Sequence, residues 1–197
     1  MFPALLDTNI LWPNLQRDFL LSLAAEGLYR PLWSEDILAE LRWSQVAKQV
    51  QAGADIGEAE DAAARLDAAM RHAFPDALVA GYEPLIGTYG LPDPDDEHVV
   101  AAAVVGGAGV IVTHNLKDFS SELLPPPLIA IDPIAFVEQT VEIDPQRAQQ
   151  AISEMAHRSG RRGPPLSAQD ILEVLDRRYG MERAMEYLRT PEAEGSE

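Results

Sequence analysis

The chain has 197 residues, of which 47% are hydrophobic, contains no cysteine and carries a formal net charge of −17. This composition predicts a globular chain of one domain, or of one domain plus an appendage, and it excludes a disordered chain. The lack of cysteine excludes disulfides, thiolate zinc sites and cysteine nucleophiles, and it favours a cytoplasmic protein. The negative charge excludes a general nucleic-acid coating protein, but not an enzyme that meets a phosphodiester through bound metal.

Two further segments bear on location. The N-terminal sequence MFPALLDTN has no basic region and no cleavage signal, so we expect no secretion. The longest uncharged apolar run covers residues 99–112 and is too short to span a bilayer. We therefore expect no membrane association.

The first two thirds of the chain alternate between strands and helices. Apolar runs predict strands at residues 4–6, 29–33, 77–82, 110–113 and 128–131. Helical periodicity predicts helices at residues 15–25, from the N-cap Ser34 through Val46, at 57–72, and from Asp95 to the glycine pair 106–107. Strands that alternate with helices indicate an α/β fold with a parallel sheet.

From Asp132 onward the pattern is helical only. Four helices are predicted, at residues 133–141, 145–157, 167–178 and 181–188. We therefore predict an α/β domain over residues 1–143, an all-helical C-terminal region over 144–190, and a disordered tail over 191–197.

Polar residues follow two of the predicted strands. Asp7 comes directly after the first strand, and Thr113 and Asn115 come after the strand at 110–113, with Asp118 in the next loop. Ligands of open parallel sheets bind beyond the carboxyl ends of the strands. These side chains converge if the two strands are neighbours.

Helical spacing adds two more acids. Asp96 shares a helix face with Val99, Val100 and Ala103, so it should point inward, whereas Asp95 and Glu97 are interpreted as capping or solvent-side charges. Glu40 follows the core position Ile37 and can point toward the sheet edge.

Asp7, Glu40 and Asp96 form the predicted inward carboxylate set, near Asn115 and Asp118. Carboxylates placed this close repel one another unless a cation lies among them. Hard oxygen ligands without a histidine or sulfur cluster select Mg²⁺ or Mn²⁺ over zinc. For Asp7 and Glu40 taken singly, a turn residue and a solvated carboxylate are the simpler interpretations.

The remaining candidate side chains have simpler interpretations. His98 and His114 are interpreted as surface or capping residues, because neither has a second histidine at metal-ligand spacing. Trp12, Trp33 and Trp43 are interpreted as core or appendage contacts.

Four segments, in this order, resemble the PIN-domain family, metal-dependent ribonucleases that include the VapC-type toxins of bacterial toxin–antitoxin pairs. The segments are LLDTNIL at 5–11, SEDILAEL at 34–41, DPDDEHVVAAA at 93–103 and VIVTHNLKDF at 110–119. The resemblance covers about residues 1–140, and the helical tail is similar to the extra C-terminal region of one subset of PIN toxins.

The resemblance implies a three-layer α/β/α domain and hydrolysis of RNA. Asp7 and Asp96 would be the central metal ligands, and Glu40 would bind through water or accept a proton. Thr113 and Asn9 would orient the ligands. Asn115 stands where many relatives carry aspartate, which weakens a second metal position, and Asp118 can compensate.

RNA and partner contacts are also expected. The basic candidates for RNA contact are Arg42, Lys48, Lys117, Arg158, Arg161 and Arg162. The resemblance further implies a cognate antitoxin, which would be a DNA-binding protein that blocks the site, and a homodimer.

Alternative functions stay open at this point. One is a non-catalytic module whose carboxylates bind a basic partner. Another is a phosphatase of the haloacid-dehalogenase type, but that chemistry needs an aspartate where this chain has Asn9. A phosphoryl-accepting receiver domain would show an early acidic pair and a late lysine.

Overall fold

The computed structural model describes residues 1–160 and 164–189. Its contacts group the chain into two compact units. The first consists of residues 1–17 and 29–133, and the second of residues 18–28 together with the chain from residue 134 onward. Helix α2 (Asn14–Ala25) begins in the first unit and ends in the second.

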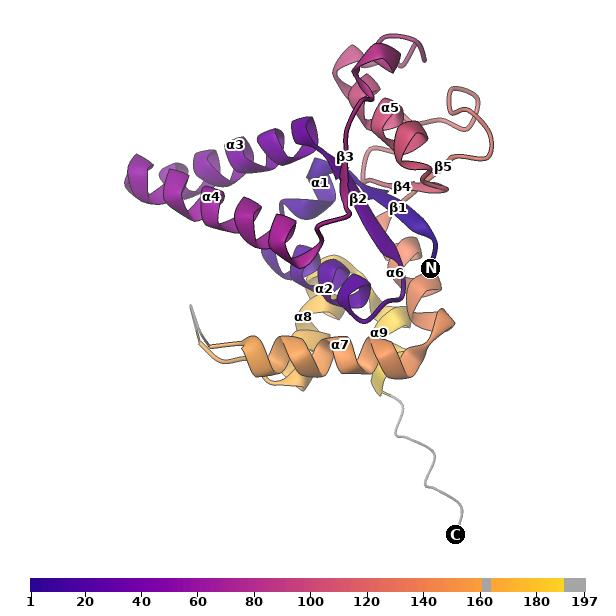
Figure 1. The fold of residues 1–197 in the computed structure, drawn as a ribbon. Coiled ribbons are helices and arrows are strands. Elements are labelled where there is room, and N and C mark those ends of the chain that lie inside the picture. The colour runs from indigo at the N-terminus through magenta and orange to yellow at the C-terminus, as the bar shows by residue number, and fades with distance from the viewer. Residues whose placement is uncertain (161–163, 190–197) are drawn as a thin grey trace. The chain divides into compact units, whose positions relative to one another are not determined.

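A five-stranded parallel sheet forms the centre of the first unit (Figure 1). Its strands are β1 (Pro3–Leu6), β2 (Arg30–Ser34), β3 (Leu78–Val79), β4 (Val110–Val112) and β5 (Ile129–Ile131), in the order β3-β2-β1-β4-β5. Leu5 and Leu6 of β1 are fully buried, as expected for the central strand of a parallel sheet. All five strands end at one edge, and the register pairs Leu6 with Val112, which makes the segments after β1 and β4 neighbours.

Helices flank this sheet. Helix α3 (Glu35–Gln51) contacts β2 and lies beside α4 (Ile56–Ala73), while α5 (Glu97–Gly106) packs on β1, β2 and β4 (Figure 1). Helix α3 starts where predicted, because the Ser34 hydroxyl accepts from the Ile37 N–H at 3.2 Å. The predicted three-layer α/β/α fold with C-terminal helices is confirmed.

Short elements complete the first unit. They are α1 (Thr8–Leu11) and the 3₁₀ turns η1 (Glu83–Leu85) and η2 (Pro94–Asp96). The sequence predicted only a polar turn where α1 forms. Asp7 is the N-cap of α1, and the Ile10 N–H donates to the Asp7 carbonyl at 3.2 Å.

Two glycines set the end of α5. Gly107 adopts the left-handed conformation, with φ of 67°, that closes the helix. A Cβ on Gly106 would lie 2.8 Å from Val79 and 2.9 Å from Leu32, so only glycine lets the helix approach β2 and β3 this closely. This close approach fixes α5, and hence Asp96 at its other end, against the sheet.

The first turns of α5 are buried on all sides, which corrects one prediction. Glu97 is 3% exposed, so it is not the solvent-side charge that the sequence suggested. Its carboxylate accepts hydrogen bonds from the N–H groups of Gly87, Tyr89 and Leu91, at 3.1, 3.0 and 3.0 Å. Glu97 therefore fixes the loop that precedes the acidic turn η2.

The second unit is helical. It contains α6 (Pro133–Ile143), α7 (Pro145–Arg158), α8 (Ala168–Tyr179) and α9 (Glu182–Arg189), and the last three pack on one another. All four predicted C-terminal helices form. Ser167 and Asp170 make the capping box that starts α8. No helix in residues 1–160 and 164–189 is both long enough and apolar enough to cross a bilayer.

The predicted boundary at residue 144 stays a prediction. The contacts of the structure group α6 and residues 18–28 with the C-terminal helices. The predicted tail at 191–197 lies outside the described residues.

Candidate active site at the carboxyl edge of the sheet

Asp7 lies at the carboxyl end of the central strand. Its N–H donates to the Val112 carbonyl at 3.1 Å, so the backbone of β1 and β4 holds it in place. The side chain is only 5% exposed. Burial raises the pKa of Asp7, and the nearby charge of Glu40 adds to the rise, although hydrogen bonds from Thr113 and Thr8 oppose it.

The Thr113 hydroxyl links the ends of β1 and β4. It donates to Asp7 Oδ2 at 2.6 Å, and it accepts from Asn9 Nδ2 at 2.9 Å and from the Asn115 N–H at 3.0 Å. The Asn9 amide also donates to Asp7 Oδ2. Thr113 and Asn9 therefore both bond the same oxygen of Asp7.

Asp96 lies across from Asp7 at the start of α5. Asn115 Nδ2 donates to Asp96 Oδ2 at 3.0 Å. Burial raises the pKa of Asp96 to about 6, and the charges of Asp7, Asp93 and Asp118 contribute to the rise. The predicted members Asn115 and Asp118 thus both act on Asp96, one by a direct bond and the other by its charge.

Glu40 is held by two side chains that the sequence did not connect with it. The Thr8 hydroxyl donates to Glu40 Oε2 at 2.6 Å, and His98 Nε2 lies 3.0 Å from Glu40 Oε1. Burial tends to raise the pKa of Glu40, but the bonds from His98 and Thr8 outweigh it and lower the pKa. Burial tends to lower the pKa of His98, but the hydrogen bond to Glu40 and the charge of Glu40 outweigh burial and raise the pKa.

This contact corrects the interpretation of His98 as a surface or capping residue. His98 is 8% exposed, and its Nδ1 is buried without a hydrogen-bond partner in the described structure. A signal in the sequence was available. The run VVAAAVV that follows His98 is apolar all round, which is typical of a buried helix.

One cavity joins these elements. It has a volume of about 450 Å³ and its lining residues are Asp7, Thr8, Asn9, Trp12, Glu40, Ser44 and Asp96. The three predicted carboxylates therefore line one cavity, although they come from widely separated segments of the chain.

The chemistry of this donor set fits a divalent cation. Burial, together with repulsion from neighbouring carboxylates, raises the pKa values of Asp7 and Asp96, and a positive charge would offset both effects. Across residues 1–160 and 164–189, however, no three acidic or histidine side chains form a ready metal-binding group. Asp7 and Asp96 are thus the best placed to hold an ion, while Glu40 is engaged with Thr8 and His98.

The charge crowding predicts that Asp96→Asn stabilises the metal-free protein. The pKa of Asp96 rises from 3.8 to about 6 on folding, so its contribution to stability is present at low pH and is lost as the pH rises through 6. Because Asp96 is partly exposed, solvent screens its charge, and we expect a gain of about 1 kcal/mol at pH 7, or roughly 3 °C in Tm. Thermal unfolding in EDTA measures this gain.

The control for this prediction is Asp95→Asn, since Asp95 is exposed and adjacent. It should change Tm by less than about 1 °C. Added Mn²⁺ should stabilise the parent more than Asp96→Asn. If Asp96→Asn had a lower Tm than the parent in EDTA, the prediction that the charge of Asp96 destabilises the metal-free protein would be wrong.

The basic side chains of the first unit that were predicted to contact RNA differ in their surroundings. Arg42 pairs with Asp67 at 3.1 Å and with Glu35 at 3.4 Å, so neighbouring carboxylates offset its charge. Lys117 is exposed in the loop after β4. Lys48 lies with its Nζ 4.4 Å from the centre of the Trp12 ring.

Three basic residues of the second unit were also predicted to contact RNA. Arg158 donates to Ser22 Oγ at 2.8 Å and pairs with Asp18 at 3.3 Å. Arg161 and Arg162 lie outside the described residues. Their predicted RNA contacts stay predictions.

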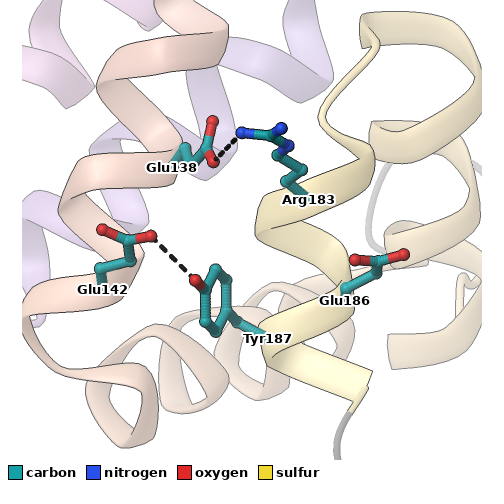
Figure 2. A pocket seen from close by; sticks show the side chains of 5 residues that line it. All are labelled: Glu138, Glu142, Arg183, Glu186 and Tyr187. Carbon is teal, nitrogen blue, oxygen red and sulfur yellow. Dashed lines mark hydrogen bonds and ion pairs between the residues drawn. The ribbon is translucent and has the colours of Figure 1, made fainter.

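A second cavity, of about 490 Å³, lies within the second unit between α6 and α9. Figure 2 shows two pairs across it: Arg183 with Glu138 at 3.2 Å, and the Tyr187 hydroxyl donating to Glu142 at 2.9 Å. The Glu186 side chain points away from these two pairs. Since these pairs join α6 to α9, we interpret them as structural, and the larger volume does not make this cavity the active site.

The tryptophan interpretations need a partial correction. Trp33 is fully buried, as expected for a core contact, but Trp12 is 40% exposed and Trp43 is 74% exposed. Trp12 and Ser44 line the cavity, and the sequence analysis assigned neither to the site. Helical spacing offered a signal for Ser44, which lies four residues after Glu40.

The comparison of the sequence with family models gives one match. The sequence model of the PIN domain matches residues 3–117, which is more than half of the chain and includes Asp7, Glu40, Asp96 and Asn115. No curated protein and no solved structure shows a significant match. The chain therefore belongs to the PIN-domain family, whose members are generally metal-dependent nucleases.

Proposed function

We propose that this protein is a divalent-metal-dependent endoribonuclease that hydrolyses RNA phosphodiester bonds. The observation that carries the proposal is the meeting of Asp7 and Asp96 in one cavity at the carboxyl edge of the sheet. Burial and the charge of Asp7 raise the cost of ionising Asp96, and a cation offsets that cost. PIN domains typically use Mg²⁺ or Mn²⁺, and we propose the same ions here.

The residues would divide the work as follows. When bound, a divalent ion supplies Lewis acidity and positive charge for phosphodiester hydrolysis. Asp7 and Asp96 hold the ion, and the bonds from Thr113 and Asn115 keep their oxygens in place.

Glu40 is suited to accept the proton of the attacking water. Its side chain is 47% exposed, so water reaches it. The bonds to Thr8 and His98 hold the carboxylate at the cavity wall. We also propose that Asp118 contributes negative charge near Asp96.

The biological role is a further part of the proposal. We propose that the protein is the toxin of a toxin–antitoxin pair, on the strength of its resemblance to VapC-type toxins. A DNA-binding antitoxin would then cover the cavity, and a basic side chain of that partner would pair with the carboxylates. A homodimer is proposed on the same resemblance.

The main alternative is a non-catalytic module that binds a basic protein. The absence of a ready metal-binding group among the described residues favours it, as does the net charge of −17. Membership of the PIN-domain family favours the nuclease over the phosphatase and the receiver domain.

The deciding experiment incubates the purified protein with labelled single-stranded RNA. We expect cleavage with Mg²⁺ or Mn²⁺, none with EDTA, and recovery when Mn²⁺ is added back in excess. Gel analysis of the fragments measures the rate. RNA that stays intact under every condition would refute the nuclease and favour the binding module.

A further inference from the structure

Trp12 is an exposed aromatic side chain in the wall of the candidate active site. It directly follows α1, is 40% exposed, and lines the same cavity as Asp7 and Asp96. The more exposed Trp43 on α3 is not among the described residues that line this cavity. An indole ring that stays exposed beside catalytic carboxylates offers a flat apolar surface to whatever binds there.

The backbone of Trp12 is held on both sides. Its N–H donates to the Thr8 carbonyl at 3.0 Å, and its own carbonyl accepts from Gln45 Nε2 at 3.0 Å. Gln45 is 6% exposed, so this second bond is partly buried. The ring is thus presented from a fixed backbone, which reduces the entropy that a ligand must offset.

Lys48 adds a positive charge to this aromatic surface. Its ammonium nitrogen lies 4.4 Å from the centre of the Trp12 ring. An indole and an ammonium group in contact match the two parts of a nucleotide, since the base stacks on the ring and the phosphate pairs with the cation. This local cation matters because the carboxylates of the cavity repel phosphate.

We infer that Trp12 and Lys48 form a nucleotide subsite beside the carboxylates, where an unpaired RNA base stacks on the indole and a phosphate contacts the ammonium group. The inference rests on the proposed nuclease function and specifies its substrate class as single-stranded RNA. Bases inside a duplex are stacked on one another and do not reach the ring.

Two measurements test the subsite. In EDTA, where no cleavage occurs, a short single-stranded oligoribonucleotide should quench the tryptophan fluorescence of Trp43→Phe but not that of Trp12→Phe. In Mn²⁺, Trp12→Ala should raise KM for single-stranded RNA by about 10- to 100-fold and change kcat by less than about 3-fold. Trp12→Phe should recover part of the loss, because its ring still stacks.

Trp43→Ala is the matched control, because it removes an even more exposed indole and should leave KM unchanged. Lys48→Gln should reduce the slope of log affinity against log salt by about 0.7. Circular dichroism confirms that each variant is folded. An unchanged KM for Trp12→Ala, or a fall in kcat alone, would overturn the subsite.

The two proposals fail in different ways. A parent protein that shows Trp12-dependent quenching but never cleaves RNA would refute the nuclease and leave the subsite standing. Cleavage that is indifferent to Trp12 would refute the subsite and leave the nuclease standing.

Discussion

The variant Asp7→Asn should cleave RNA about 1000-fold more slowly than the parent protein at saturating Mn²⁺. Asp7 is the buried carboxylate at the end of the central strand, and a neutral amide there removes one of the two charges proposed to hold the ion. The loss should appear in kcat/KM for a labelled RNA. Calorimetry should show weaker Mn²⁺ binding in the same variant.

Loss of folding should not explain this result. Burial raises the pKa of Asp7, so the charge itself is costly in the folded protein and its removal should not destabilise it. The carbonyl oxygen of an asparagine can still accept from Thr113 and Asn9, which bond one Asp7 oxygen in the parent. We therefore expect the Tm of Asp7→Asn in EDTA to equal or exceed that of the parent.

The exposed Asp95 supplies the control, because Asp95→Asn removes the same charge from the acidic turn next to Asp96. Asp95→Asn should keep its cleavage rate within about 2-fold. A variant Asp7→Asn that retained a tenth or more of the parent activity would show that Asp7 is not a central ligand.

The second large effect concerns stability. Glu97→Ala should lower the free energy of unfolding by about 3 kcal/mol, measured by urea denaturation. The carboxylate of Glu97 accepts from three backbone N–H groups between Gly87 and Leu91, and alanine leaves these donors without it. The loop should then loosen, and amide exchange of Tyr89 and Leu91 should become faster.

Two comparisons sharpen this prediction. Glu97→Gln should recover only part of the stability, because Oε2 accepts from both Gly87 and Tyr89 and Oε1 accepts from Leu91, so either amide orientation turns a donor toward a donor. Glu60 is exposed on α4, and Glu60→Ala should shift stability by less than about 0.5 kcal/mol.

The effect should also depend on pH. Burial tends to raise the pKa of Glu97, but the backbone N–H bonds outweigh it and lower the pKa below 4.5. The stabilisation is therefore fully present above pH 4.5 and is lost as the pH falls through the lowered pKa. The gap between parent and Glu97→Ala should narrow in acid. A constant gap down to pH 3 would show that the charge of Glu97 contributes little.

The elements of the fold follow from local patterns in the sequence. Alternating apolar runs and helical segments predicted all five strands, and the Ser34 cap and the glycines at 106 and 107 marked helix ends that form as expected. Local signals suffice here because capping, left-handed glycines and apolar periodicity act over a few neighbouring residues.

The prediction that Asp7 and Thr113 lie close together depended on a condition. It required the first and fourth strands to be adjacent, and strand order depends on long-range packing that periodicity does not encode. The structure pairs β1 with β4, so the condition holds.

By itself, the sequence determined the parallel α/β fold and the helical C-terminal region, because each depends on the spacing of residues along one element. It proposed Asp7, Glu40 and Asp96 as acids at the sheet edge, but their meeting in one cavity depends on strand order and helix packing. Only the tertiary structure decided that Glu97 and His98 are buried partners and that Trp12 lines the cavity. The physical reason is that a side chain's neighbours come from distant segments. His98 lies 58 residues from Glu40, and only the packing of α5 and α3 at the same sheet edge brings the two within 3.0 Å.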